Sequence, residues 1–166
     1  MLDRIGVAMW PESVQRVSSF LGEAGVDARV QEFPGGTPTA DAAARAVGCA
    51  LAQIVKSLVF VCDGVYVLAL VPGDERADEA KVAAAAGARR ARVARAPEVE
   101  NATGFAPGAV APFPQRAVAR TVMDRTFLQH AVVWIGAGSP AHMAAIAPAD
   151  LQRLANARLF DLTTRG

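Results

Sequence analysis

The stretch AQIVKSLVFVCDGVYVLALV, residues 52–71, contains two apolar runs joined by Asp63-Gly64. An Asp-Gly pair between two such runs is a strong signal for a two-residue hairpin turn. We therefore expect one strand at residues 55–62 and a second at residues 65–71. Both runs are apolar at successive positions, which predicts that the two strands lie centrally in a sheet that is covered on each face.

A single lysine, Lys56, stands at the start of the first of these strands. Removing a cationic side chain from water is costly, so its position needs a reason. One interpretation is that the side chain extends from the strand end into solvent. The other is that it projects into a cleft beside the core, where a low dielectric strengthens its attraction for a phosphate or carbonyl oxygen.

The composition favours one globular domain, residues 1–166, because the chain has 166 residues and a hydrophobic fraction of 52%. Its formal net charge is +1, so any contact with nucleic acid must come from a local patch. The first residues lack the apolar core of a signal peptide, and charged residues interrupt the longest apolar stretch. We expect a cytoplasmic protein without a membrane span, in which Cys49 and Cys62 are buried, reduced thiols.

Periodicity and turn residues predict the remaining elements. The expected helices are residues 11–25, 39–47, 74–86, 97–104 and 148–154. The second follows a loop at residues 34–38, and Thr39 or Asp41 can cap it. The expected strands are residues 27–33, 91–94, 117–122, 131–135, 141–146 and 158–162. Helices and strands alternate irregularly and hairpins are frequent, which indicates an α+β domain with a mixed sheet rather than a doubly wound parallel one.

Two loops rich in glycine and proline are candidates for binding, TGFAPGAVAPF at residues 103–113 and WIGAGSP at residues 134–140. Each can present backbone N–H groups to a ligand oxygen, or can simply form turns. The arginine-rich run at residues 87–96 is open in the same way, since it suits a solvated surface or a phosphate-binding patch. Its candidate phosphate ligands are Arg89, Arg90, Arg92 and Arg95.

Several other kinds of site are disfavoured by the spacing of the residues. His130 and His142 stand alone, without HExxH or CxxC, so we expect no metal. The segment GAGSPA lacks the third glycine and the following helix of a dinucleotide-binding loop. The sequence contains neither a P-loop nor a GxSxG elbow, and we expect no cofactor.

The order of IVKSLVF, a hairpin, TGFxxGxxxPF, a VMD strand end, WIGAG and an APADL helix resembles the YbaK/prolyl-tRNA-synthetase-associated domain family of freestanding aminoacyl-tRNA editing deacylases. The resemblance covers nearly the whole chain and implies one α+β domain, a twisted, mixed, barrel-like sheet surrounded by helices. It also implies that Lys56 and Gly108 are catalytic residues in the pocket that holds the misattached amino acid and the terminal adenosine. The loop-shaping and substrate-binding residues that it implies are Ser57, Thr103, Gly104, Phe105, Pro112, Gly136, Ala137, Gly138 and Ser139.

The chain departs from the family pattern at two places. Ser57 stands where members associated with alanyl-tRNA carry Asn, and Gly136-Ala137-Gly138 replaces the Ser-Gly-Gly of Cys-tRNA editors. The resemblance implies hydrolysis, in trans, of mischarged tRNA, and members with a similar loop are associated with small residues such as Ala, Ser or Thr. An aminoacyl ester is already activated, so its hydrolysis needs mainly positioning, a water and oxyanion stabilisation. The resemblance also implies that the ribose 2′-OH of the tRNA orients or activates that water.

Two other functions remain open from the sequence. One is a non-catalytic module that binds tRNA or a synthetase, and the other is a metal-independent hydrolase of a small ester. The partner that the resemblance implies is the acceptor end of aminoacyl-tRNA, with a synthetase as an open alternative. We expect neither DNA nor a membrane as a partner.

Overall fold

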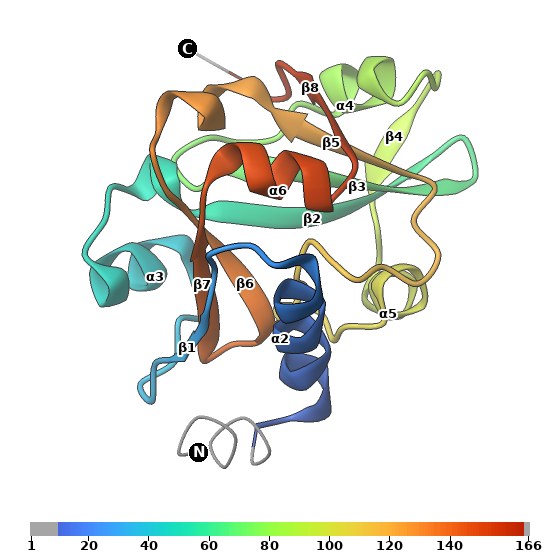
Figure 1. Ribbon diagram of the computed structural model, residues 1–166. Coiled ribbons are helices and arrows are strands. Elements are labelled where there is room, and N and C mark those ends of the chain that lie inside the picture. Colours follow the sequence, from blue (N-terminus) through green and yellow to red (C-terminus); the bar gives the residue numbers. More distant parts are fainter. Residues whose placement is uncertain (1–9, 165–166) are drawn as a thin grey trace.

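The computed structural model describes residues 10–164, which form two β-sheets with helices packed around them (Figure 1). The strands are β1 (Val30–Glu32), β2 (Val55–Cys62), β3 (Val65–Pro72), β4 (Ala91–Val93), β5 (Arg120–Asp124), β6 (Val133–Ser139), β7 (His142–Ile146) and β8 (Ala157–Phe160). The helices are α2 (Glu12–Ala24), α3 (Ala40–Val47), α4 (Glu79–Ala85), α5 (Ala96–Thr103) and α6 (Pro148–Leu154), with short 3₁₀ turns η1 (Leu51–Gln53) and η2 (Arg125–Gln129).

The hairpin of β2 and β3 lies at the centre of the larger sheet, whose strand order is β4-β2-β3-β5-β8. Its two strands pair antiparallel along their whole length. The turn residues Asp63 and Gly64 both have positive φ, 48° and 86°, as the tight hairpin turn requires. The hairpin and its central position are therefore confirmed.

Both faces of β3 are buried, and they contribute to different hydrophobic clusters. Leu68 and Leu70 pack into the larger cluster, which includes residues of α2, α6, β6 and β7. Val67, Ala69 and Val71 point to the other face and pack beneath α4. This alternation explains why the strand is apolar at successive positions.

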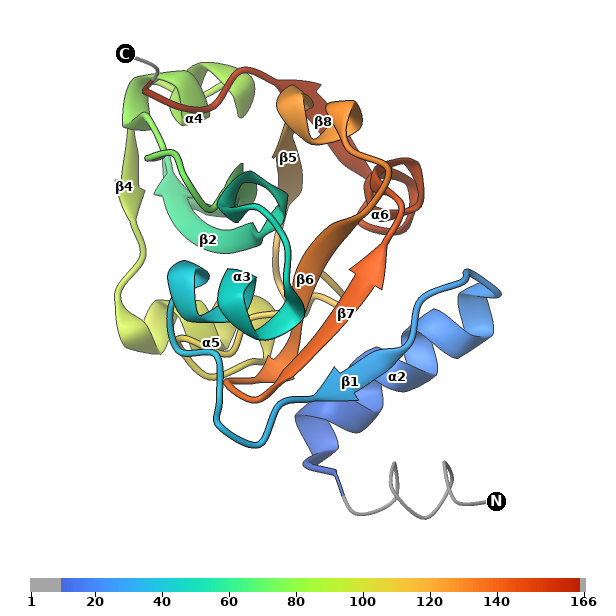
Figure 2. The same cartoon turned by 90° about the vertical axis from the view of Figure 1, so that its left-hand side faces the viewer.

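The second sheet contains β1, β7 and β6 in antiparallel order and lies beside β2 (Figure 2). A parallel bridge between Ile54 and Trp134 joins it to the larger sheet. The larger sheet is mixed, because β3–β5 and β5–β8 are parallel pairs. The α+β fold class is confirmed, and its strands are divided between two sheets that approach each other at this bridge.

The sequence-based assignments of three segments were wrong, and distant contacts explain two of them. Helix α4 begins at Glu79 and not at residue 74, since the Asp78 side chain caps it and the Asp78 N–H donates to Leu162 O. Residues 136–140, expected to be a loop, mostly continue β6 to Ser139 through a register shift. The expected strand at 117–122 is also displaced, to Arg120–Asp124.

Gly138 shows why β6 carries glycines. Its φ is +100°, and an added Cβ would lie 2.7 Å from the backbone oxygen of Ser13. The Ser13 hydroxyl donates to the Gly138 carbonyl oxygen at 2.7 Å. This contact holds the start of α2 directly against the strand.

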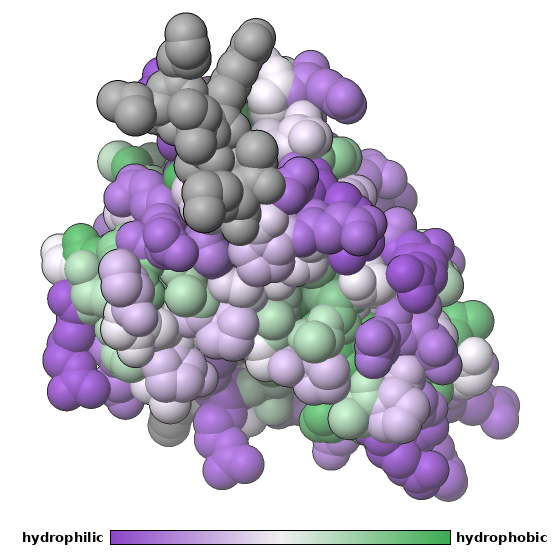
Figure 3. Space-filling model, turned by 90° about the horizontal axis from the view of Figure 1, so that it is seen from below, coloured by the Kyte–Doolittle hydropathy of each residue, from purple (hydrophilic) through white to green (hydrophobic). Residues whose placement is uncertain are grey.

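The surface of the described residues is mixed in character. Figure 3 shows hydrophilic residues interspersed with weakly apolar ones on the face seen from below. No helix within residues 10–164 is long and apolar enough to cross a lipid bilayer. Cys62 is buried as expected, whereas Cys49 is only half-buried, because it follows α3 at the edge of the fold.

Gly73 provides a test of the packing at the end of the hairpin. A Cβ at this position would lie 2.6 Å from Leu51 O and 3.1 Å from the Ile54 Cβ. Gly73→Ala should therefore lower the free energy of unfolding by about 1–3 kcal/mol, as overpacking does. Gly35→Ala is the control, because its Cβ would meet nothing within 4 Å. Equal denaturation midpoints for the two variants would contradict this packing.

Candidate functional site

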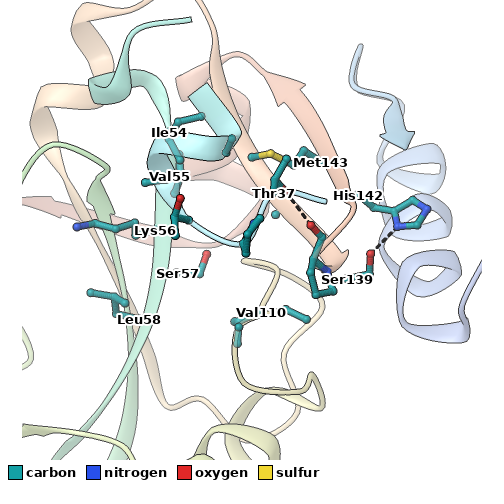
Figure 4. A pocket seen from close by; sticks show the side chains of 18 residues that line it. Thr37, Ile54, Val55, Lys56, Ser57, Leu58, Val110, Ser139, His142 and Met143 are labelled. Carbon is teal, nitrogen blue, oxygen red and sulfur yellow. Dashed lines mark hydrogen bonds between the residues drawn. The ribbon is translucent and has the colours of Figure 1, made fainter. Parts of the chain in front are cut away.

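A pocket of about 320 Å³ lies where β2 and β6 diverge beyond the Ile54–Trp134 bridge (Figure 4). Its walls come from segments that are far apart in the sequence. The lining residues are Thr37, Pro38, Thr39, Ala40, Ala43, Ile54, Val55, Lys56, Ser57, Leu58, Gly108, Ala109, Val110, Gly136, Ser139, Pro140, His142 and Met143.

Five of the residues singled out from the sequence line this pocket together: Lys56, Ser57, Gly108, Gly136 and Ser139. The two glycine loops meet here, since a Cβ on Gly136 would lie only 3.1 Å from the Val110 carbonyl oxygen. Gly108 has a φ of +80°, while a Cβ there would meet nothing within 4 Å. A glycine at position 108 therefore suits the left-handed backbone conformation that the chain adopts beside the pocket.

The other six site residues that were expected from the sequence lie outside the pocket lining and make structural contacts. Thr103 and Gly104 end α5, where the Thr103 hydroxyl donates to Val99 O and the Gly104 carbonyl accepts from the Arg16 guanidinium at 2.8 Å. The buried Phe105 ring lies 5.0 Å below the same guanidinium. The last three are buried or packed against α2: Pro112, Ala137 and Gly138.

Lys56 lines the pocket, but Figure 4 shows its ammonium directed away from Ser139 and Val110. The ammonium donates a hydrogen bond of 2.5 Å to the Glu75 carbonyl oxygen. Burial lowers the pKa of Lys56, the nearby Asp74 and Glu75 oppose this, and Arg76 adds to it. Lys56 thus lies at the rim, between the pocket and an adjoining groove that Leu58 and Arg76 also line.

His142 is the pocket residue whose chemistry the sequence did not reveal. Its side chain is buried, and its Nδ1 lies 2.5 Å from the Ser139 hydroxyl. That hydroxyl also accepts from the Ala141 N–H at 3.0 Å, so Ser139 is held by two contacts within the β6–β7 hairpin. His142 Nε2 faces the Glu32 carboxylate at 3.6 Å. The signal in the sequence was the spacing of Ser139 and His142 across a hairpin.

The wall that contains Ser139 is also tied to the loop before α3. The Pro140 carbonyl oxygen accepts from both the backbone N–H and the hydroxyl of Thr37, at 2.6 and 2.9 Å. Thr39 caps α3 by accepting from the Ala42 N–H. The sequence indicated this loop and this cap, but it did not indicate that they line the pocket.

The arginine run follows the far end of the hairpin. Asp63 accepts from the backbone N–H groups of Arg89 and Arg90 at 2.8 and 3.1 Å. The Arg92 guanidinium makes two hydrogen bonds of 2.8 Å to Glu98. This pairing, with the Arg95 backbone N–H, lowers the pKa of Glu98 to about 2. The run is exposed, and Arg92 already has an acidic partner.

The described part of the chain, residues 10–164, contains no group of three or more His, Cys, Asp or Glu side chains that could hold a metal ion. The chemistry available at the pocket is therefore that of a rim ammonium, hydroxyl groups, an imidazole and backbone groups of two glycine segments.

The burial of His142 leads to a prediction about how the free energy of unfolding depends on pH. Desolvation lowers its pKa below the usual 6.5, although Glu32 opposes this. The unfolded chain therefore binds this proton more readily, and stability should be lost as the pH falls below 6.5. His142→Gln should flatten the dependence of unfolding free energy on pH between 7 and 5, by at most about 1.4 kcal/mol per pH unit. His130→Gln is the control; a slope equally reduced by both substitutions would contradict the prediction.

Comparison with known proteins identifies relatives of this chain. Residues 35–154 match the aminoacyl-tRNA editing domain family. The chain is 25% identical over 128 residues to a candidate Cys-tRNA(Pro)/Cys-tRNA(Cys) deacylase, EbsC, of Enterococcus faecalis, covering 76% of this chain and 78% of the relative. It is 32% identical over 114 residues to the multifunctional Ser/Thr-tRNA deacylase ProXp-y of Escherichia coli, covering 66% and 68%.

A larger protein and a solved structure complete the comparison. A proline–tRNA ligase of Xanthomonas oryzae is 33% identical over 109 residues, and the matched part makes up 19% of the ligase. The crystal structure of a candidate trans-editing enzyme for prolyl-tRNA synthetase superposes with a TM-score of 0.87 and 36% identity, covering 94% of this chain and 99% of that one. The family resemblance seen in the sequence is confirmed: the chain belongs to the aminoacyl-tRNA editing domain family.

Proposed function

We propose that this protein hydrolyses, in trans, the ester that joins a small amino acid to the terminal ribose of a mischarged tRNA. The observation that carries the proposal is the convergence of β2, the Gly108 segment and β6 on one pocket. The family match at residues 35–154 includes every segment that lines it. The relatives named as tRNA deacylases support the same reaction.

The pocket suits a small aminoacyl group. Its volume of about 320 Å³ is at the low end for ligand sites, and part of its wall is apolar, including Ile54, Val55 and Met143. The aminoacyl ester is activated, so the protein needs mainly to position it and to stabilise the developing oxyanion. We propose that the 2′-OH of the tRNA's own ribose orients the attacking water, and that the backbone near Gly108 lies against the ester.

Lys56 is proposed to hold the nucleotide end of the substrate. Its ammonium lies at the rim of the pocket, on the opposite side of β2 from Ser57 (Figure 4). From there it can bind a phosphate oxygen of the acceptor strand, while the amino acid occupies the pocket itself. Because the Lys56 side chain is half-buried, its charge acts in a reduced dielectric.

The proposed partner is the acceptor end of aminoacyl-tRNA, and the proposed site of action is the cytoplasm. Association with a synthetase stays a prediction. Its support is the occurrence of a related segment within proline–tRNA ligases.

A deacylation assay tests the function directly. The wild-type protein should hydrolyse tRNA esters of Ala, Ser or Thr faster than those of Leu or Phe, because the pocket is small. Lys56→Ala should lower kcat/KM by about 10²-fold, as the loss of one preorganised electrostatic contact does. Lys81→Ala is the matched control, because its ammonium instead binds Asp161 and Thr163 O. If the wild type bound tRNA and hydrolysed none of these esters, the protein would be a binding module.

The arginine run leads to a separate prediction about salt. If the exposed side chains of Arg89, Arg90 and Arg95 contact tRNA phosphates, the affinity should fall steeply with salt concentration. Each substitution to Gln should then reduce the log–log slope by about one unit. Arg92→Gln should have less effect, because Glu98 already pairs with Arg92. A slope that is unchanged in the triple variant would assign the run to solvated surface.

A further inference from the structure

Four hydroxyl-bearing residues are among those that line the pocket: Thr37, Thr39, Ser57 and Ser139. Three of these hydroxyls have partners within the fold. Thr37 donates to Pro140 O, and Thr39 accepts from the Ala42 N–H. Ser139 accepts from the Ala141 N–H and is hydrogen-bonded to His142 Nδ1, so it has two partners within the fold.

The Ser57 hydroxyl is different. Its Oγ is shielded from solvent and has no hydrogen-bond partner among residues 10–164. It belongs to β2, and the residues on either side of it on the same face, Val55 and Val59, are buried in the larger hydrophobic cluster. Figure 4 shows the hydroxyl on the side of the strand that faces Val110 and Ser139. A buried hydroxyl without a partner is costly, and a bound ligand that pairs with it removes that cost.

The chemistry of this position limits the groups that a ligand can place against Ser57. A serine hydroxyl can donate one hydrogen bond and accept others. An ammonium group only donates and an ester carbonyl only accepts, whereas a second hydroxyl does both. Lys56, which is proposed to bind the nucleotide end, lies on the other side of β2, so the group that meets Ser57 belongs to the aminoacyl moiety: its side chain, its α-ammonium or its ester carbonyl.

We propose that Ser57 is a specificity-determining residue that hydrogen-bonds the side-chain hydroxyl of a seryl or threonyl group. The proposal rests on the proposed deacylase function and adds the substrate class. It also distinguishes Ser57 from Ser139, whose hydroxyl has two partners within the fold. Apolar walls discriminate weakly between isosteres, but a buried group that needs a hydrogen bond strongly disfavours the analogue that lacks one.

The experiment compares seryl, 2-aminobutyryl and alanyl esters on the same tRNA. Serine and 2-aminobutyrate have nearly the same shape and differ in a hydroxyl and a methyl group, so pocket size does not separate them. The wild type should prefer the seryl ester in kcat/KM by about tenfold or more. Ser57→Ala should lower seryl hydrolysis by about tenfold and leave the 2-aminobutyryl rate unchanged or higher, which brings the ratio close to one.

Ser139→Ala is the matched control. Because the Ser139 hydroxyl is already hydrogen-bonded to Ala141 and His142, its loss should change the rates for all three esters by the same factor. A collapse of the seryl preference in Ser139→Ala but not in Ser57→Ala would overturn the proposal. So would an equal loss of all three activities in Ser57→Ala, because Ser57 would then contact a group that every substrate shares.

A binding measurement separates this proposal from the proposed function. If the wild type hydrolyses none of the esters, the deacylase function fails, but adenosine carrying a non-hydrolysable 3′-amide-linked seryl or 2-aminobutyryl group still probes the pocket. Tighter binding of the seryl compound to the wild type, lost in Ser57→Ala, would support the role of Ser57. Equal binding of the two compounds to the wild type would overturn it.

Discussion

The pairing of β2 with β3 is the constraint on which both the core and the candidate site depend. The register is set by a two-residue turn and places Lys56 opposite Val71 and Ser57 opposite Leu70. Side chains alternate along a strand, so a slip of one residue would exchange the two faces. The same pairing that buries β3 on both sides therefore sends the ammonium to the rim and the hydroxyl into the pocket.

The pocket exists because the two sheets meet at one bridge and then separate. Two glycines of β6 allow the backbone of other segments to approach this strand closely. Gly136 admits the carbonyl of Val110, and Gly138 admits the start of α2. Residues such as Thr103 and Phe105 hold the intervening loop from behind, without lining the cavity.

Local chemistry explains what could be predicted from the sequence. The Asp63-Gly64 turn, the Thr39 cap and the helix that begins at Pro148 are each specified by adjacent residues, and each was correct. The start of α4 depends on Leu162, and the strand at residues 136–139 depends on its pairing with β7. Such long-range contacts leave no local signature, so these boundaries were wrong.

The residues of the candidate site could likewise be predicted from the sequence only in part. The family pattern identified Lys56, Gly108 and the β6 segment as neighbours, and the structure brings them together. It did not indicate which serine has a partner, because that depends on His142 and Ala141 as the hairpin folds. Nor did it indicate the direction of the Lys56 ammonium, which is set by the position of the Glu75 carbonyl.

The partner of Lys56 has a further consequence. A carboxylate in direct contact would form an ion pair with the ammonium, whereas the Glu75 carbonyl oxygen fixes the ammonium without forming one. The loss of side-chain freedom is then incurred when the chain folds, and not when a ligand arrives. An incoming anion would meet an ammonium that is already oriented, and it would replace an uncharged acceptor.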